Sequence, residues 1–184
     1  MKEKINKTNV ARLLDKAKVA YEVDESDLSA THVAEQLGED IAQVFKTLVL
    51  HGEKSGYFVC VIPGGEEVDL KKAAKVSGNK KCELIPMKEL LPLTGYIRGG
   101  CSPIGMKKHF PTYLHASAMD FDAIYISAGQ RGLQAKLAPA DLNTFHRRIV
   151  MSVMVNNEAK IAQEVRSAAR FCLVYPMPTL LYKE

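Results

Sequence analysis

The most promising candidates for a binding or catalytic role lie in one short stretch, residues 96–105. Glycine lets the backbone take positive φ and come close to a ligand, and proline removes one amide donor. The remaining amides could form a concave site for a carbonyl, an oxyanion or a phosphate. The same composition is also typical of a tight surface turn, so both interpretations stay open. The residues concerned are Gly99, Gly100, Cys101, Ser102, Pro103 and Gly105.

Lys46 is a second candidate, because it stands alone among apolar residues. Val44 and Phe45 precede it, and the run from Thr47 to Leu50 follows it. Burying an unpaired ammonium there would be costly, so its charge needs compensation. One solution is a side chain that extends to solvent at a helix-to-strand junction. The other is an ammonium that points into a cleft and binds a phosphate or the carbonyl of an ester.

Cys101 could act as a nucleophile with a histidine as its base, since His109 and His115 follow it. Such a pair depends on spatial contact rather than on sequence spacing, so this pattern is weak. The other histidines show no metal-ligand spacing, and the four cysteines contain no C-x-x-C pair. We therefore expect no metal, no cofactor and no disulfide framework.

Length and composition are those of a globular chain. It has 184 residues, of which 47% are hydrophobic, and this is ample for a core. No apolar run is long enough to span a bilayer, and the N-terminus lacks the apolar segment of a signal peptide, so we expect a cytoplasmic protein. The net charge of +4 is mildly basic. Lysines cluster over residues 71–81 and at 107–108, which suits either a phosphate-binding surface or a solvated helix face.

The hydrophobic pattern predicts a mixed α+β fold. The most definite prediction is a hairpin of two strands, residues 47–52 and 57–62. Past about residue 143 the pattern changes, and we expect a helix over 158–171 outside the main core. Other expected elements are helices within 6–18, 31–37 and 68–76, a polar, acidic loop over 24–29, and strands at 113–115, 124–128 and 133–137.

Three motifs in the same order resemble the YbaK family of Cys-tRNA(Pro) deacylases. They are Val-Phe-Lys-Thr-Leu-Val at 44–49, the glycine-rich motif at 95–108, and Ile-Tyr-Ile-Ser-Ala-Gly-Gln-Arg-Gly-Leu at 124–133. The wider superfamily includes the editing domain inserted in bacterial prolyl-tRNA synthetases. The resemblance implies an α+β fold with a barrel-like, curved sheet flanked by helices. We expect such a domain over residues 1–142 and an extension of unknown role over 143–184.

The resemblance also implies an enzyme that removes cysteine from mischarged tRNA(Pro), and it implies roles for particular residues. Lys46 would be the catalytic cation that holds the terminal adenosine or its ester. The amides of the glycine-rich stretch would hold the reacting carbonyl, and Ser127 and Gly129 would wall the pocket. The full set of expected substrate-binding residues is Tyr21, Thr47, Gly99, Gly100, Cys101, Ser102, Pro103, Gly105, Ser127 and Gly129.

In this family the substrate's own cysteine thiol is thought to attack its carbonyl, so that the amino acid leaves as a cyclic thioester. An intramolecular nucleophile has a high effective molarity, and the protein then needs only to fix its conformation and stabilise the oxyanion. Cys101 would lend only its backbone amide. Two features depart from the family pattern: the segment over residues 18–23 is short, and Gln134 replaces an acidic residue found in some relatives, which could change the amino-acid preference.

The expected partners are tRNA, through its aminoacylated CCA end, and prolyl-tRNA synthetase, which would supply specificity for tRNA(Pro). A different class of function also stays open. The chain could be a module that binds tRNA or the synthetase without cleaving anything, as the short segment and the C-terminal extension suggest. Hydrolysis with multiple turnover distinguishes the two.

Overall fold

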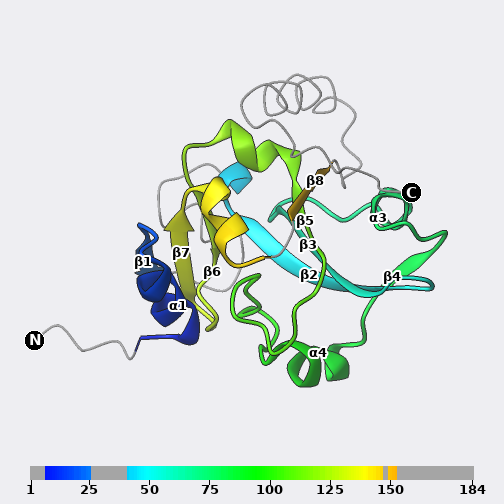
Figure 1. Ribbon diagram of the computed structural model, residues 1–184, viewed down its shortest axis with the longest axis horizontal. Coiled ribbons are helices and arrows are strands. Elements are labelled where there is room, and N and C mark those ends of the chain that lie inside the picture. The colour runs from blue at the N-terminus through cyan, green and yellow to red at the C-terminus, as the bar shows by residue number, and fades with distance from the viewer. Residues whose placement is uncertain (1–6, 26–40, 147–148, 153–184) are drawn as a thin grey trace, which may run out of the picture.

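The computed structural model describes residues 7–25, 41–146 and 149–152 (Figure 1). The helices expected over residues 31–37 and 158–171 lie outside these ranges. None of the helices within them is long and apolar enough to cross a membrane. In chain order the elements are α1 (Asn9–Ala17), β1 (Glu22–Glu25), the 3-10 helix η1 (Ile41–Gln43), β2 (Phe45–Gly52), β3 (Gly56–Pro63), α3 (Leu70–Val76), β4 (Cys82–Leu84), α4 (Met87–Thr94), β5 (Thr112–His115), η2 (Ala116–Asp120), β6 (Ile124–Ser127), β7 (Leu133–Leu137), η3 (Pro139–Thr144) and β8 (Ile149–Ser152).

The strands form two sheets, and the predicted α+β class is confirmed. A five-stranded sheet has the order β4-β2-β3-β5-β8, and a three-stranded sheet has the order β1-β7-β6. The predicted hairpin is β2 and β3, which pair antiparallel, whereas β5 runs parallel to both β3 and β8. An isolated parallel bridge between Val44 and Tyr125 joins the sheets. Among the described strands this contact leaves the curved arrangement open rather than closed into a barrel.

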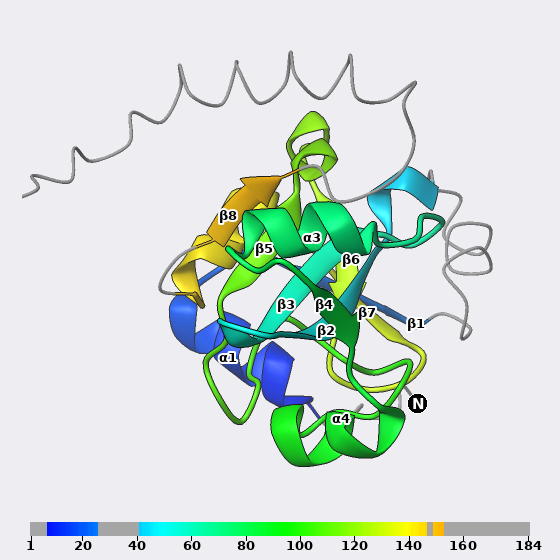
Figure 2. The ribbon, with the colours of Figure 1, turned by 90° about the vertical axis from the view of Figure 1, so that its right-hand side faces the viewer.

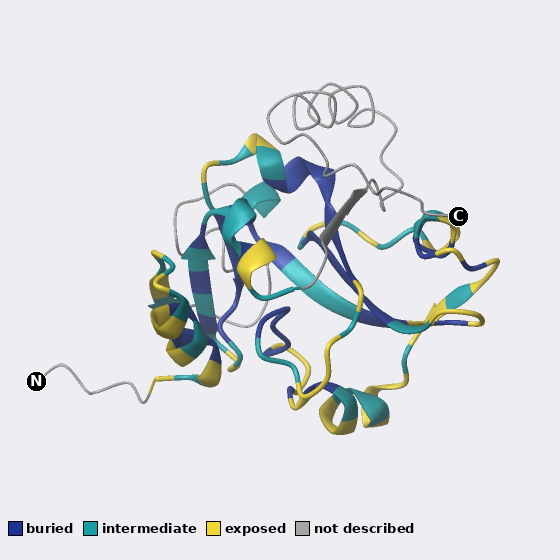
Figure 3. Ribbon diagram, viewed as in Figure 1, coloured by how far each residue is buried: buried dark blue, intermediate teal, exposed yellow. Residues whose placement is uncertain are grey.

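The centre of the five-stranded sheet, at β3, is buried on both faces, which explains the continuous apolar run of this strand. One face carries Phe58 and Ile62, which share a core cluster with Ala73 of α3. The opposite face carries Val59 and Val61, which join the larger core with residues of α1, β6 and β7. Figure 2 shows α3 lying across the sheet, and Figure 3 shows the buried strands between these layers.

The sheet continues past residue 142, where the domain was expected to end. β8 pairs in parallel with β5, and Leu142 and Phe145 pack in or against the larger core. The segment from residue 143 to Ser152 therefore contributes to the same folded unit, apart from residues 147–148, which are not described. A four-residue strand whose partner lies more than thirty residues earlier has little local sequence pattern to identify it.

The turn between β6 and β7 needs glycine at position 129. Gly129 has φ +87°, and a Cβ there would lie 2.9 Å from Val10 Cγ2 and 3.0 Å from Tyr96 Cε1. Gly56, at the start of β3, has a similar φ of +71° but has open space around its Cβ position. The two glycines therefore share the backbone requirement and differ in packing.

We expect Gly129→Ala to reduce the free energy of unfolding more than Gly56→Ala does. Both substitutions place alanine in the left-handed region, at a cost of about 1–2 kcal/mol, and the crowded site adds roughly 1–3 kcal/mol of overpacking. Urea denaturation of the two variants measures the difference. Equal losses would contradict the packing that surrounds Gly129.

His146 couples the segment after η3 to the start of β5. Its Nδ1 lies 3.2 Å from Thr112 Oγ1. Burial, with a smaller contribution from the nearby His109, lowers the pKa of His146 from 6.5 to about 4. The folded state therefore holds this imidazole neutral where the unfolded chain protonates it.

The stability of the protein should consequently depend on His146 in mildly acidic solution. Between pH 6.5 and about 4, His146 is protonated in the unfolded state but stays neutral in the folded state. The free energy of unfolding therefore falls as the pH drops through this range. His146→Gln should remove up to about 3 kcal/mol of that decline, measured by denaturant unfolding at several pH values. His51→Gln, at an exposed position of β2, should retain it. An unchanged decline in His146→Gln would contradict the assignment.

Candidate functional site

Lys46 lies on β2 at a partly buried position, opposite Ile62 of β3. Its Nζ donates a hydrogen bond to the carbonyl oxygen of Gly64 at 3.2 Å. Burial lowers the pKa of the ammonium, and the carboxylates of Glu67 and Glu66 act in the opposite direction. The positive charge of Lys46 is therefore compensated by protein groups of the segment that follows β3, and not only by solvent.

Strand alternation places Lys46 on the same sheet face as Ser127. Val44 and Tyr125 form the parallel bridge between the sheets, and two residues further along each strand come Lys46 and Ser127. Ser127 lies opposite Gln134 on β7, which in turn lies opposite Asp24 on β1. Directly opposed residues project to the same face, so this row of polar side chains extends from Ser127 across the three-stranded sheet.

A second row of paired residues, next to the row through Ser127, shows which face of the three-stranded sheet carries Ser127. Lys136 lies opposite both Tyr125 and Glu22, and its Nζ is 5.2 Å from the centre of the Tyr125 ring. The alternate residues Ile124 and Ile126 are buried in the larger core. The face that carries Ser127 is therefore the face turned away from that core.

Thr47, which was expected to bind substrate beside Lys46, lies on the opposite face of β2. Its neighbours in the alternation, Phe45 and Val49, belong to the larger core together with Cys101. Thr47 Oγ1 is buried, and it has no hydrogen-bond partner among the described residues. Its binding role stays a prediction, and the structure separates it from Lys46 by the thickness of the strand.

The glycine-rich loop, residues 95–105, is fixed by hydrogen bonds within itself. The Tyr96 hydroxyl donates to the carbonyl of Ile104 at 2.6 Å. The amide of Ile104 donates to Ser102 Oγ at 3.2 Å, and the amide of Gly100 donates to the carbonyl of Ile97 at 3.0 Å. Ser102 is fully buried, so it supports the loop from within, and the Gly100 amide is already engaged.

This loop contacts the turn between β6 and β7 at backbone distance. A Cβ at Gly100 would lie 3.1 Å from the backbone nitrogen of Arg131 and 3.2 Å from the carbonyl carbon of Gln130. At Gly99, which is exposed, a Cβ would meet the Arg131 side chain. Within the turn, the Gly129 amide donates to Ser127 Oγ at 3.3 Å. The turn is therefore the common neighbour of the loop and of the strand that carries Ser127.

Cys101 is a poor candidate for a nucleophile. It is 8% exposed, and burial raises the pKa of its thiol to about 12, with Thr94 acting in the opposite direction. At neutral pH the group is a thiol rather than the reactive thiolate. His115 is fully buried at the end of β5, where its Nδ1 lies 2.9 Å from Ser117 Oγ. The structure thus gives the proposed Cys–His pair no geometric support.

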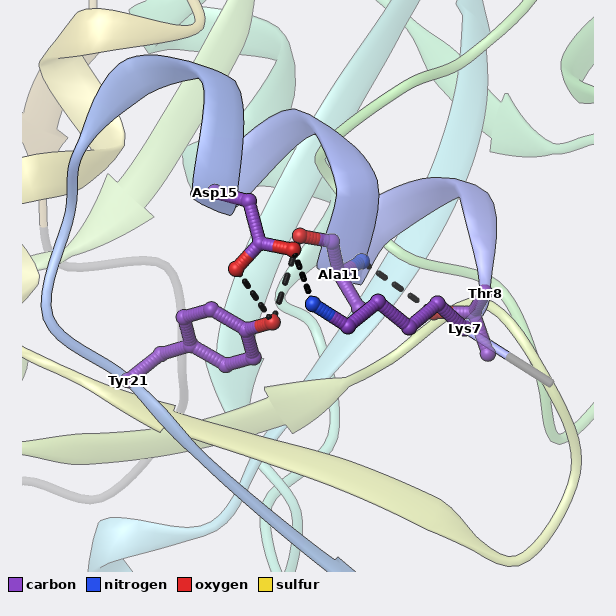
Figure 4. Close-up of polar contacts among 5 residues, drawn as sticks. All are labelled: Lys7, Thr8, Ala11, Asp15 and Tyr21. Atoms are coloured by element: carbon purple, nitrogen blue, oxygen red, sulfur yellow. Dashed lines mark hydrogen bonds and ion pairs between the residues drawn. The ribbon is translucent and has the colours of Figure 1, made fainter. Parts of the chain in front are cut away.

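Tyr21 is engaged with α1 (Figure 4). Its hydroxyl lies 3.0 Å from Asp15 Oδ1 and 3.3 Å from the carbonyl oxygen of Ala11. Asp15 also forms an ion pair with Lys7 at 2.6 Å. The neighbouring Thr8 caps the helix by accepting a hydrogen bond from the Ala11 amide. Tyr21 therefore links the chain before β1 to the helix, and its role in binding substrate stays a prediction.

The structure brings part of the expected site together. Ser127, Gly129, Gly99 and Gly100 converge at the β6–β7 turn. Lys46 lies on β2, two residues beyond the Val44–Tyr125 bridge that joins β2 to β6. Pro103 and Gly105 lie on another side of the loop, where they line a separate cavity. No cluster of three or more His, Cys, Asp or Glu side chains within the described ranges is arranged to hold a metal ion.

Sequence reasoning missed the segment that contacts Lys46, residues 64–67. The hairpin register could have revealed it. Gly52 pairs with Gly56 across the turn, and counting back six residues from Gly52 pairs Lys46 with Ile62. The residues just after β3 must therefore return to Lys46. Asp24, at the far end of the row through Ser127, was also missed, because it was assigned to a loop.

Comparison with known proteins places this arrangement in a family. Residues 24–145 match the family described as the aminoacyl-tRNA editing domain. EbsC of Enterococcus faecalis, named as a candidate Cys-tRNA(Pro)/Cys-tRNA(Cys) deacylase, is 55% identical over 138 residues, which is 72% of this chain and 84% of that protein. YwhH of Bacillus subtilis, an uncharacterised protein, is 29% identical over 124 residues, covering 67% of this chain and 78% of YwhH.

The fold has a counterpart among solved structures. A crystal structure described as a candidate trans-editing enzyme for prolyl-tRNA synthetase superposes with a TM-score of 0.73 at 23% identity, covering 80% of this chain and 95% of that one. That likeness concerns the fold alone. The match over residues 24–145 includes Lys46, the glycine-rich loop and the β6–β7 turn. The chain therefore belongs to the aminoacyl-tRNA editing domain family.

Proposed function

We propose that this protein hydrolyses the ester of mischarged Cys-tRNA(Pro), acting in trans to the synthetase. Membership of the aminoacyl-tRNA editing domain family is the observation that carries this proposal. The name of the 55% identical relative supports the same reaction and substrate. The polar face with Lys46 and Ser127, next to a glycine-rich loop, supplies groups suited to an ester and its ribose.

In the proposed reaction the nucleophile belongs to the substrate. The cysteinyl sulfur attacks its own carbonyl carbon, and the bond from that carbon to the ribose oxygen breaks. The thiol proton passes to the ribose oxygen, so the tRNA leaves with an intact terminal hydroxyl. The four-membered cyclic thioester that forms is then hydrolysed by water to free cysteine. The buried Cys101 thiol, with its pKa raised to about 12, takes no part in this sequence.

The protein's own residues would bind and orient the ester. The Lys46 ammonium would hold the ribose or carbonyl oxygen and stabilise the negative charge that develops there. The amides of Gly99 and Cys101 are the loop donors best suited to the oxyanion, because no described residue accepts a hydrogen bond from either and both keep some exposure. Ser127 and the neutral Gln134 would form the wall around the amino-acid side chain.

The first test compares two esters on the same tRNA. Purified protein should hydrolyse Cys-tRNA(Pro) well above the spontaneous rate and leave Ala-tRNA(Pro) almost untouched, because alanine carries no thiol. Release of radiolabelled amino acid measures both rates. Equal rates for the two esters would contradict the substrate-thiol mechanism. No hydrolysis of either, combined with salt-sensitive tRNA binding, would favour a non-catalytic module instead.

Lys46→Ala should lower kcat/KM for Cys-tRNA(Pro) at least about 100-fold, the scale of one well-placed charged donor. Lys54→Ala, which removes an exposed lysine from the β2–β3 turn, is the matched control and should stay within about twofold. Full activity in Lys46→Ala would remove this residue from the site.

Cys101→Ala should keep at least about a third of the parent activity, since the proposed reaction needs the backbone of Cys101 and not its thiol. Release of radiolabelled cysteine from Cys-tRNA(Pro) measures it. Thermal unfolding of the variant separates a loss of fold from a loss of chemistry. A folded but inactive Cys101→Ala protein would overturn the assignment of the nucleophile to the substrate.

A further inference from the structure

A cavity of about 260 Å³ lies on the side of the glycine-rich loop that Pro103 and Gly105 form. The segment before β5, the residues after η3, and α1 contribute its other walls. An apolar cavity of about 150 Å³ already accommodates benzene, so this one is large enough for a planar heterocycle. Neither the proposed chemistry nor the contacts of Lys46 use it.

The interior of this cavity is largely apolar and electrically neutral. Leu13, Met106, Phe110 and Phe145 contribute apolar or aromatic walls. The imidazole of His146, which also lines it, is neutral at physiological pH because burial lowers its pKa to about 4. Its Nε2 is buried and has no hydrogen-bond partner among the described residues. Such an interior favours a flat, neutral ring that can stack and form a hydrogen bond.

The edge of the cavity is cationic. The exposed Lys108 lines this edge, and the exposed Lys107 precedes it in the chain. None of the side chains that line the cavity is acidic. A neutral interior beneath a cationic edge is complementary to a nucleotide, with the base inside and the phosphate outside.

The cavity and the candidate site share one loop. Gly100 contacts the β6–β7 turn, and Pro103 lines the cavity. The three residues of chain from one to the other span at most about 10 Å. Linked nucleotides of one short strand are therefore able to reach both places.

We propose that this cavity binds one nucleotide of the unpaired 3′ end of the RNA substrate, upstream of the nucleotide that carries the ester. This inference rests on the proposed function for the identity of the RNA. The base enters between Met106, Phe110 and Phe145, and Lys108 holds the adjoining phosphate. The contact positions the strand and adds affinity, while the ester lies at the face that carries Lys46.

The test uses an uncharged acceptor-stem RNA hairpin with a single-stranded 3′-ACCA end, and the same hairpin without those four nucleotides. The protein is labelled with ¹³C at its methionine methyl groups, and Met106→Leu assigns the Met106 signal. The complete hairpin should shift that signal through the ring current of a stacked base, and the trimmed hairpin should not. The exposed Met87 on α4 is the internal control and should stay in place with both.

Affinity provides an independent measurement. Lys108→Ala should weaken binding of the complete hairpin about 5- to 10-fold in fluorescence anisotropy, whereas Lys54→Ala, which removes the exposed lysine of the β2–β3 turn, should change it less than about twofold. Binding of the hairpin with no Met106 shift, or equal losses in the two lysine variants, would overturn the inference.

The hairpin carries no ester, so these measurements are separate from catalysis. Deacylation of Cys-tRNA(Pro) with no RNA base in the cavity would refute this inference and leave the proposed function intact. A base in the cavity of a protein that cleaves no aminoacyl ester would refute the proposed function alone.

Discussion

The close backbone approach of Gly100 to the turn between β6 and β7 is the constraint on which the candidate site depends. A Cβ at this glycine would come within 3.1 Å of a backbone nitrogen, and backbone atoms cannot rotate away as a flexible side chain can. The approach sets the loop against the strand that carries Ser127. Because β6 also lies beside β2, the same contact fixes where the loop stands relative to Lys46.

The two faces of β2 separate positioning from packing. Residues on one face, including Thr47, belong to the interior with the buried side of the glycine-rich loop, whereas Lys46 lies on the face shared with Ser127 and Gln134. A cation among apolar neighbours is tolerated because it lies at the edge of the hairpin, where Gly64 accepts its hydrogen bond. The loop then contributes from its exposed end, at Gly99, while Ser102 and Tyr96 hold its interior.

This division suits a reaction in which the substrate carries its own nucleophile. The described residues place a buried, neutral thiol at Cys101 and a fully buried imidazole at His115, and neither is arranged as an activated nucleophile or base. They do place backbone donors and a small polar side chain at one turn, and a cation on the adjoining strand β2. Orientation and charge stabilisation are the contributions that such groups can make.

The α+β class, the β2–β3 hairpin and the family motifs could all be predicted from the amino-acid sequence, because they depend on local alternation, turn residues and short motifs. The sequence also identified Lys46 as a cation needing compensation. The three-dimensional fold was needed to show that Gly64 accepts the hydrogen bond of Lys46 and that Thr47 lies on the other face of β2. It was also needed to show that Ser102 supports the loop from within and that β8 extends the sheet past residue 142. These outcomes depend on which distant strands pair and in what register, and a local pattern of residues does not encode that choice.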